Sequence, residues 1–157
     1  MMETEKEDIY FMYELNYGML CVNFIEVLDY CFKNSDSFSL ITTLKKPYTR
    51  IPPICEHDSI IECWKNCLIN ILPDIKKWPG TETKCNHKVM FIYNAKKFRR
   101  TYHNISNFFL AIEQNLPEDI CFYRDKKVWL YTITHERNAV IVSPSMKDLD
   151  YFKLYLN

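Results

Sequence analysis

Two Cys-x-His units are the residues whose types and spacing come nearest to a metal site. Cys55 and His57 form the first unit, and Cys85 and His87 form the second. In extended backbone, residues i and i+2 point the same way, so each unit could offer a thiolate and an imidazole to one zinc ion. The spacing matches none of the usual Cys-x2-Cys ribbons or fingers. We therefore expect no cofactor, and a metal-binding or nuclease-like enzyme built on these units is the alternative.

The histidines also offer acid–base chemistry, but no spacing ties them together. His103 and the run His135-Glu136-Arg137 complete the four histidines of the 157-residue chain. Metal-free phosphate chemistry would need two proton-transfer groups and a cation for the phosphate. Lys96 to His103 mixes cations with aromatic rings, as surfaces for single-stranded nucleic acid do, yet its rings fit the core stripe of a helix. The sequence contains no glycine-rich phosphate loop and no nucleophile motif, so we expect no catalysis.

Aromatic residues are more numerous than one core is expected to bury. The chain has 11 tyrosines and three tryptophans, and both types are favoured at interfaces because they bury a large area at low entropic cost. Those that lie off the clearest core stripes are Tyr10, Tyr13, Tyr17, Tyr48, Trp78, Tyr151 and Tyr155. We expect part of this set to contact a partner protein. A homodimer in which such rings bury each other is a second alternative.

The elements that position these residues follow from the spacing of apolar side chains. Helical spacing predicts helices over 15–33, 59–71, 97–115 and from Ser145 onward. The first of these has a buried stripe of Leu20, Phe24, Val27, Leu28 and Cys31. Runs of β-branched and aromatic residues predict strands over 38–44, 89–93, 120–123, 128–133 and 139–142. Residues 45–57 read as a loop, and Trp78-Pro79-Gly80-Thr81 reads as a turn.

This order of elements predicts the fold class α+β. We expect one domain over residues 9–157, with a largely antiparallel sheet of four to five strands and three or four helices packed on it. Residues 1–8 read as a flexible acidic tail. A length of 157 residues suits one core, since single domains usually run to about 100–200 residues.

Charge and composition narrow the class of protein. Lys plus Arg (20) equals Asp plus Glu (20), which argues against a nucleic-acid or membrane-surface binder that works through bulk charge. The acidic start is unlike the basic start of a secretory signal, and no apolar run approaches the roughly 20 residues that span a bilayer. The seven cysteines then read as reduced thiols in a cytoplasmic protein.

Three stretches of the chain resemble a known family. They are Trp78 to Thr83 followed by Asn86 to Met90; Leu116 to Arg124; and Trp129-Leu130 through Thr134-His135-Glu136. Together they resemble small bacterial proteins, some of which look like immunity proteins paired with contact-dependent or other polymorphic toxins. The resemblance spans residues 37–142 and carries no catalytic residues.

This resemblance implies a cytoplasmic inhibitor that binds a cognate toxin domain one-to-one, without catalysis. The toxins are often basic nucleases, whose inhibitors offer acidic residues to the nucleic-acid site. The residues expected to bind the partner are Glu56, Asp58, Trp78, Glu82, Glu118, Asp119, Asp125, Glu136 and Tyr48. The acids lie in predicted loops or turns, where recognition residues concentrate. The zero net charge departs from the strongly acidic inhibitor expected for a nuclease.

Overall fold

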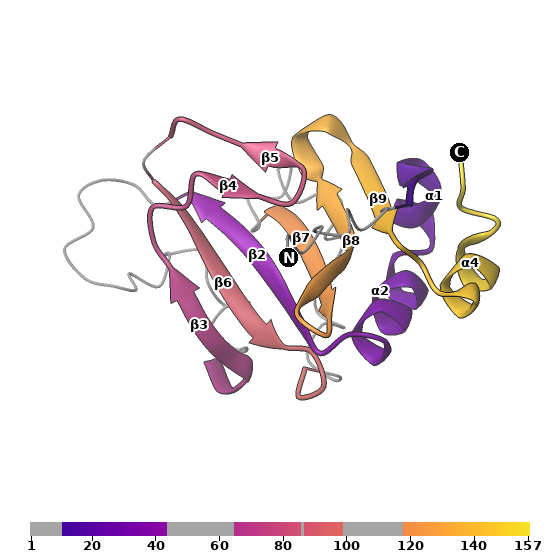
Figure 1. Cartoon of the computed structure of the whole chain (residues 1–157), viewed down its shortest axis with the longest axis horizontal. Helices are drawn as coiled ribbons and strands as arrows, with labels where there is room; N and C mark the ends of the chain where they lie inside the picture. Colours follow the sequence, from indigo (N-terminus) through magenta and orange to yellow (C-terminus); the bar gives the residue numbers. More distant parts are fainter. Residues whose placement is uncertain (1–10, 44–64, 86, 99–117) are drawn as a thin grey trace, which may run out of the picture.

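A seven-stranded antiparallel sheet dominates the computed structural model, which describes residues 11–43, 65–85, 87–98 and 118–157. The strand order is β1-β9-β8-β7-β2-β6-β3, and a separate two-stranded hairpin contains β4 and β5 (Figure 1). The strands of the large sheet are β1 Met12–Leu15, β2 Ser37–Thr43, β3 Leu68–Leu72, β6 Lys88–Asn94, β7 Glu118–Arg124, β8 Lys127–Ile133 and β9 Asn138–Val142. The hairpin consists of β4 Lys77–Trp78 and β5 Thr81–Glu82.

The helices of the described residues are short and lie together near the β1–β9 end of the sheet (Figure 1). They are α1 Tyr17–Val22, α2 Phe24–Lys33 and α4 Met146–Phe152, with single 3-10 turns η1 Lys65–Cys67 and η4 Thr134–Glu136. The predicted fold class, an α+β domain with a four- to five-stranded sheet under packed helices, is therefore wrong. The described part of the chain is mostly β, because its sheet has seven strands.

Part of the error lies in the predicted helix over 59–71. Residues 68–72 form the edge strand β3, which pairs with β6 through Leu72 opposite Met90. Periodicity alone cannot separate a short buried helix from a strand in an apolar run of this length. The neighbouring strand β6 decides the outcome because it supplies backbone partners. Residues 59–64 of this prediction lie outside the described residues.

The strand β1 was also missing from the sequence prediction. It is only four residues long and begins next to the predicted acidic tail, so it carries too few alternations to be detected. Its register places Met12 opposite Val142 and Leu15 opposite Ala139 on β9. The loop predicted over 45–57, the tail over 1–8 and residues 99–115 of the third predicted helix lie outside the described residues.

The helix predicted over 15–33 is confirmed, although it forms as two helices that meet at Asn23. The Asn16 side chain caps α1 by accepting a hydrogen bond from the Met19 N–H at 3.1 Å, which satisfies a backbone donor that the helix start leaves open. All five residues of the predicted stripe are buried. The five predicted strands are confirmed, and Ser145 and Asp148 form the predicted capping box at the start of α4.

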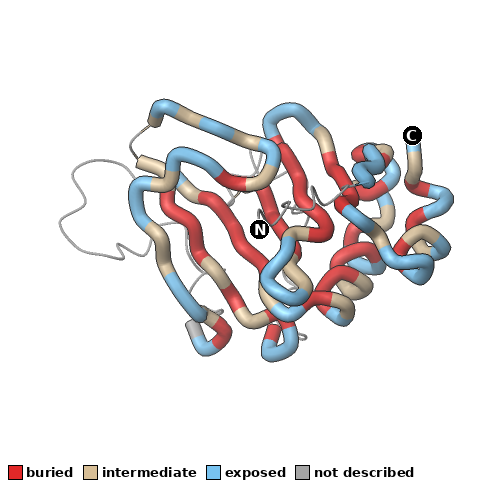
Figure 2. Tube along the Cα trace, viewed as in Figure 1, coloured by how far each residue is buried: buried red, intermediate tan, exposed pale blue. Residues whose placement is uncertain are grey.

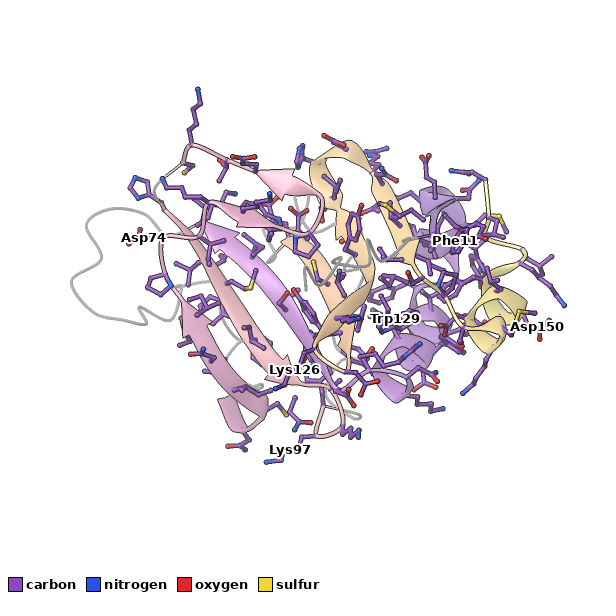
Figure 3. The ribbon with its side chains drawn as sticks, viewed as in Figure 1. Phe11, Asp74, Lys97, Lys126, Trp129 and Asp150 are labelled. Atoms are coloured by element: carbon purple, nitrogen blue, oxygen red, sulfur yellow. The ribbon has the colours of Figure 1, made fainter. Side chains whose placement is uncertain are left out.

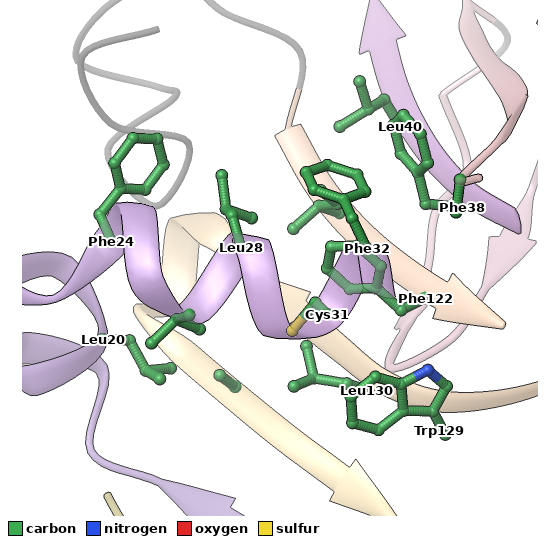
Figure 4. Close-up of a cluster of buried hydrophobic side chains, with 14 of the residues drawn as sticks. Leu20, Phe24, Leu28, Cys31, Phe32, Phe38, Leu40, Phe122, Trp129 and Leu130 are labelled. Carbon is green, nitrogen blue, oxygen red and sulfur yellow. The ribbon is translucent and has the colours of Figure 1, made fainter. Parts of the chain in front are cut away.

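The larger core lies on the face of the sheet toward α1, α2 and α4. Phe32 of α2 packs edge-on against Phe38 of β2 and Phe122 of β7, with ring centroids 4.9 and 5.3 Å apart (Figure 4). Trp129 and Leu130 both point into this core although they are adjacent on β8. The pairing of β7 with β8 shifts its register at this point, and such a bulge puts two neighbours on one face.

The β4–β5 hairpin covers part of the opposite face. Trp78 packs there with Ile41 and Met90, and the tight turn at Gly80 has φ +76°. A Cβ atom at Gly80 would lie 2.5 Å from the Tyr131 ring, so the turn needs glycine both for its φ and for this close approach. Figure 2 shows the central strands largely buried and the connecting turns exposed.

Among the described residues, no helix has the length and apolar character to cross a membrane.

Candidate functional site

Asp119, at the start of β7, is the centre of a buried polar cluster. One carboxylate oxygen accepts a hydrogen bond from the Trp78 indole N–H at 2.8 Å, and the other accepts one from the Thr134 backbone N–H at 2.7 Å. The Asp119 N–H in turn donates to the Thr134 hydroxyl at 2.9 Å. Asp119 has φ +52°, a left-handed conformation that aspartate tolerates better than most residues. The cluster ties the β4–β5 hairpin to the β8–β9 turn.

Charged side chains surround Asp119 at the surface. Lys88 and Glu118 form a half-buried ion pair with a 2.6 Å separation, whereas His135 and Glu136 are exposed on the β8–β9 turn. Four residues that are predicted from the sequence to bind a partner lie together at this corner: Trp78, Glu118, Asp119 and Glu136. We call this set together with His135 the Asp119 corner.

The Asp119 corner holds the one group among the described residues with the donor types of a metal site. Ligand atoms of Glu118, Asp119 and His135 lie within 4.8 Å of one another. Both Asp119 oxygens already accept hydrogen bonds from the protein, and Glu118 is paired with Lys88. Both carboxylates therefore already have partners within the protein, and the arrangement gives no support to a metal centre.

Burial changes the role of two residues expected to bind a partner. Trp78 is 5% exposed and Asp119 is 1% exposed, so neither can offer much area to another protein without unfolding of the hairpin. Of the other aromatic residues in the candidate set, Tyr17 and Tyr155 are buried and Tyr151 is half-buried. Tyr17 is buried, and its hydroxyl bonds to the Thr134 side chain; Tyr151 stacks on Tyr30 with ring centroids 3.8 Å apart.

The predicted acidic residues do not gather into one patch. Asp125 lies in the β7–β8 turn, where its N–H donates to Asp36, at the opposite end of β7 from Glu118. Seven residues of strand put these ends about 20 Å apart. Glu82 is exposed on the hairpin. Cys85 and His87 are both half-buried near the start of β6. The remaining candidates, Tyr48, Cys55, Glu56, His57 and Asp58, lie outside the described residues.

A second polar cluster joins α2, α4 and the β7–β8 hairpin. Arg124 directs two guanidinium nitrogens at the Asp148 carboxylate, 2.9 and 3.2 Å away, and its Cζ lies 4.4 Å from the centroid of the Trp129 ring. Tyr30 donates to the same carboxylate at 2.9 Å. Burial disfavours the charged carboxylate, but the bonds from Arg124, Ser145 and Tyr30 outweigh it and hold the pKa of Asp148 below its usual value.

A surface that the sequence analysis did not identify lies at the helical end of the molecule. All but one of the large apolar side chains that are exposed in the described residues belong to β1, the residue before it, α1, α2, α4 or the segment after α4; the exception is Ile69. We call this group of residues the apolar end: Phe11, Met12, Tyr13, Met19, Val22, Ile25, Met146 and Leu154. Its two members on β1 lie on opposite faces of the sheet, since Met12 pairs with Val142 and Tyr13 pairs with Ile141 of the helix-side core. Phe11 lies in this region of the molecule, away from Asp74 and Lys97 (Figure 3).

Val22 and Ile25 are the clearest members of the apolar end. They are 83% and 50% exposed, and they lie three residues apart where α1 passes into α2. Helical periodicity explains their exposure, because the opposite side of these helices buries Leu20, Val27 and Leu28. The pattern could have been found in the sequence as apolar residues off the buried stripe.

Comparison with protein-family models, with curated proteins and with solved structures finds no match to this chain.

Proposed function

We propose that the protein binds a partner protein one-to-one through the apolar end and catalyses no reaction itself. The exposure of Val22, Ile25 and their neighbours carries this proposal. Large apolar side chains that gather on one part of a surface mark interaction sites, because covering them removes apolar area from water. The proposal includes Tyr13, which is 37% exposed and so keeps ring area available for contact.

Charged residues border this surface, as they do in specific interfaces. Glu26 of α2 follows Ile25 and Lys147 of α4 follows Met146 in the sequence, and Asp29 and Asp150 lie on the same two helices. Tyr17, on the buried side of α1, interacts with the Thr134 side chain. Thr134 in turn is hydrogen-bonded to Asp119 of the Asp119 corner. The exposed His135 and Glu136 of the β8–β9 turn can therefore belong to the rim of the same interface.

The partner we propose is a bacterial toxin domain, which the protein would neutralise in the cytoplasm as an immunity protein does. The family resemblance supports this partner class. A tight inhibitor needs a rigid scaffold and a complementary patch, and the buried hydrogen bonds of Asp119 and Asp148 supply such rigidity behind the surface. The balanced charge of the chain favours an apolar interface over a purely acidic one.

The proposal predicts that the gene beside this one encodes a toxin domain, and co-expression with that domain tests it. The wild-type chain is expected to restore growth. The double variant Val22→Asp/Ile25→Asp should fail to do so, because two charges would be buried without partners at the interface. Ile69→Asp is the matched control, since Ile69 is 57% exposed but lies on β3, at the other edge of the sheet. Equal protection by all three chains would contradict the apolar end as the binding surface.

A further inference from the structure

Lysines gather at the end of the large sheet where β6 ends and β7 turns into β8. Lys96 and Lys97 follow β6, whereas Lys126 and Lys127 lie at the β7–β8 turn. All four side chains are exposed, and Figure 3 shows Lys97 and Lys126 at the same end of the molecule. We call these four residues, together with the exposed Lys147 of α4, the basic end.

The turn between α2 and β2 holds the segments of the basic end together. The Asp36 backbone carbonyl accepts a hydrogen bond from the Ala95 N–H at 3.0 Å, and the Asp36 carboxylate accepts one from the Asp125 N–H at 2.8 Å. Two residues earlier, the Asn34 side-chain oxygen accepts a hydrogen bond from the Lys147 ammonium group at 2.9 Å. The lysines therefore belong to one surface, because the same turn contacts all three of their segments.

Positive charge exceeds negative charge at the basic end. The neighbouring cations Lys33 and Arg124 are each matched by a carboxylate in an ion pair. Among the described residues of the three segments and the α2–β2 turn, two further carboxylates remain: Asp36, which lies 3.5 Å from the Lys96 ammonium group, and Asp125. Two carboxylates cannot neutralise five lysines, so an excess of three positive charges results. The balanced charge of the whole chain thus hides a basic surface.

The residues around these lysines favour a phosphate backbone as the ligand. Protein interfaces are depleted of lysine and have an apolar core, whereas none of the large exposed apolar side chains among the described residues lies in the segment after β6 or in the β7–β8 turn. Single-stranded nucleic acid stacks its bases on exposed rings. The aromatic residues that are nearest along the chain, Phe98, Tyr123 and Trp129, are buried or half-buried. Phosphates of a duplex need neither apolar area nor exposed rings.

We propose that the basic end binds double-stranded nucleic acid through its phosphate groups. In the sheet, β2 lies between β6 and β7, so the two pairs of lysines are attached to backbone about 10 Å apart. Each strand of a duplex carries one phosphate per about 3.4 Å of helix axis, so both pairs of lysines can contact the same duplex. Contacts to phosphate carry no base information, and binding should therefore not depend on the base sequence.

Fluorescence anisotropy with a labelled DNA duplex of about 20 base pairs tests this proposal. The wild type is expected to bind with a Kd of about 1–10 μM at about 50 mM salt, and a plot of log K against log salt concentration should have a slope of about −3. In Lys126→Gln/Lys127→Gln, the affinity should fall at least about tenfold and the slope should become shallower by about 1–2. Lys96→Gln/Lys97→Gln should have the same effect.

The matched control is Lys77→Gln/Lys84→Gln, which removes the same charge from two exposed lysines near the start of β6. This variant is expected to bind the duplex as the wild type does. The proposal is overturned if the wild type does not bind, if the basic-end variants bind normally, or if the control loses as much affinity. Tighter binding to a single strand, to a polyglutamate peptide or to phosphatidylserine vesicles would also overturn it. The assay contains no toxin domain, so its outcome is independent of the proposed function.

Discussion

The indole N–H of Trp78 donates a 2.8 Å hydrogen bond to the carboxylate of Asp119, 41 residues further along the chain. This contact fastens the β4–β5 hairpin to the start of β7. Both partners are buried, so the bond forms where an unpaired polar atom is costly. Two residues that we expected on a binding surface from their types are thus part of the internal framework.

Replacing Trp78 with Phe should destabilise the fold. The ring would keep most of its contacts with Ile41 and Met90, but one Asp119 oxygen would lose its partner. We expect a loss of about 1–3 kcal/mol in the free energy of unfolding, measured by urea denaturation. The double variant Trp78→Phe/Asp119→Asn should lose less than the sum of the single variants. Strict additivity would contradict an energetic coupling between the two side chains.

The sequence predicted local features well where a repeating pattern was long enough. The stripe from Leu20 to Cys31 identified a buried helix face, and the pair Ser145 and Asp148 identified a helix start. In contrast, β3 was mistaken for a helix because a strand of five residues, four of them apolar, carries too little periodicity. Its strand state depends on β6, whose partner residue Met90 is distant in sequence from Leu72.

The candidate site could be predicted only in part for the same reason. Residue types suggested that Trp78 and Asp119 matter, and the structure places them together. Whether each side chain points outward depends on long-range packing, such as the hairpin folding over Tyr131, which no local pattern contains. The apolar end was not predicted because its most exposed helical members, Val22 and Ile25, are aliphatic, and only acidic and aromatic residues were expected at the binding surface.

Replacing Gly80 with Ala should be destabilising. The substitution forces a side chain into φ +76° and places its Cβ 2.5 Å from the Tyr131 ring. We expect a loss of about 1–3 kcal/mol in thermal or urea unfolding. Gly18→Ala is the matched control, because that site is helical and its nearest contact would be 3.5 Å away. A neutral Gly80→Ala, or an equally harmful Gly18→Ala, would contradict this account of the turn.

The Asp148 carboxyl should make stability depend on pH in the acidic range. Its pKa in the folded protein lies below the ordinary value near 3.8, so the folded state binds fewer protons than the unfolded state. The stabilisation is complete above the unfolded pKa and is lost as pH falls through the folded pKa. In Asp148→Asn, urea unfolding should show a cost of about 2–3 kcal/mol at pH 7 and a smaller loss between pH 5 and pH 3 than the wild type. An unchanged acid profile would contradict this role.

Thiol labelling should divide the cysteines by burial. Cys31 and Cys121 are fully buried, and burial raises the pKa of both thiols, so little reactive thiolate forms at neutral pH. Cys21 and Cys85 are half-buried. Iodoacetamide followed by peptide mass spectrometry should modify Cys21 and Cys85 at least about tenfold faster than Cys31 and Cys121. In urea all four cysteines should react at similar rates. Similar rates for all four in the native protein would contradict the core described above.

Calorimetric titration of the proposed partner, a bacterial toxin domain, into the purified chain tests the central claim most directly. We predict saturation at one toxin domain per chain. In Val22→Asp, binding should weaken by about 2 kcal/mol or more, roughly thirtyfold, while Ile69→Asp binds as the wild type does. The absence of binding to the wild type, or equal affinity for wild type and Val22→Asp, would contradict a partner site at the apolar end.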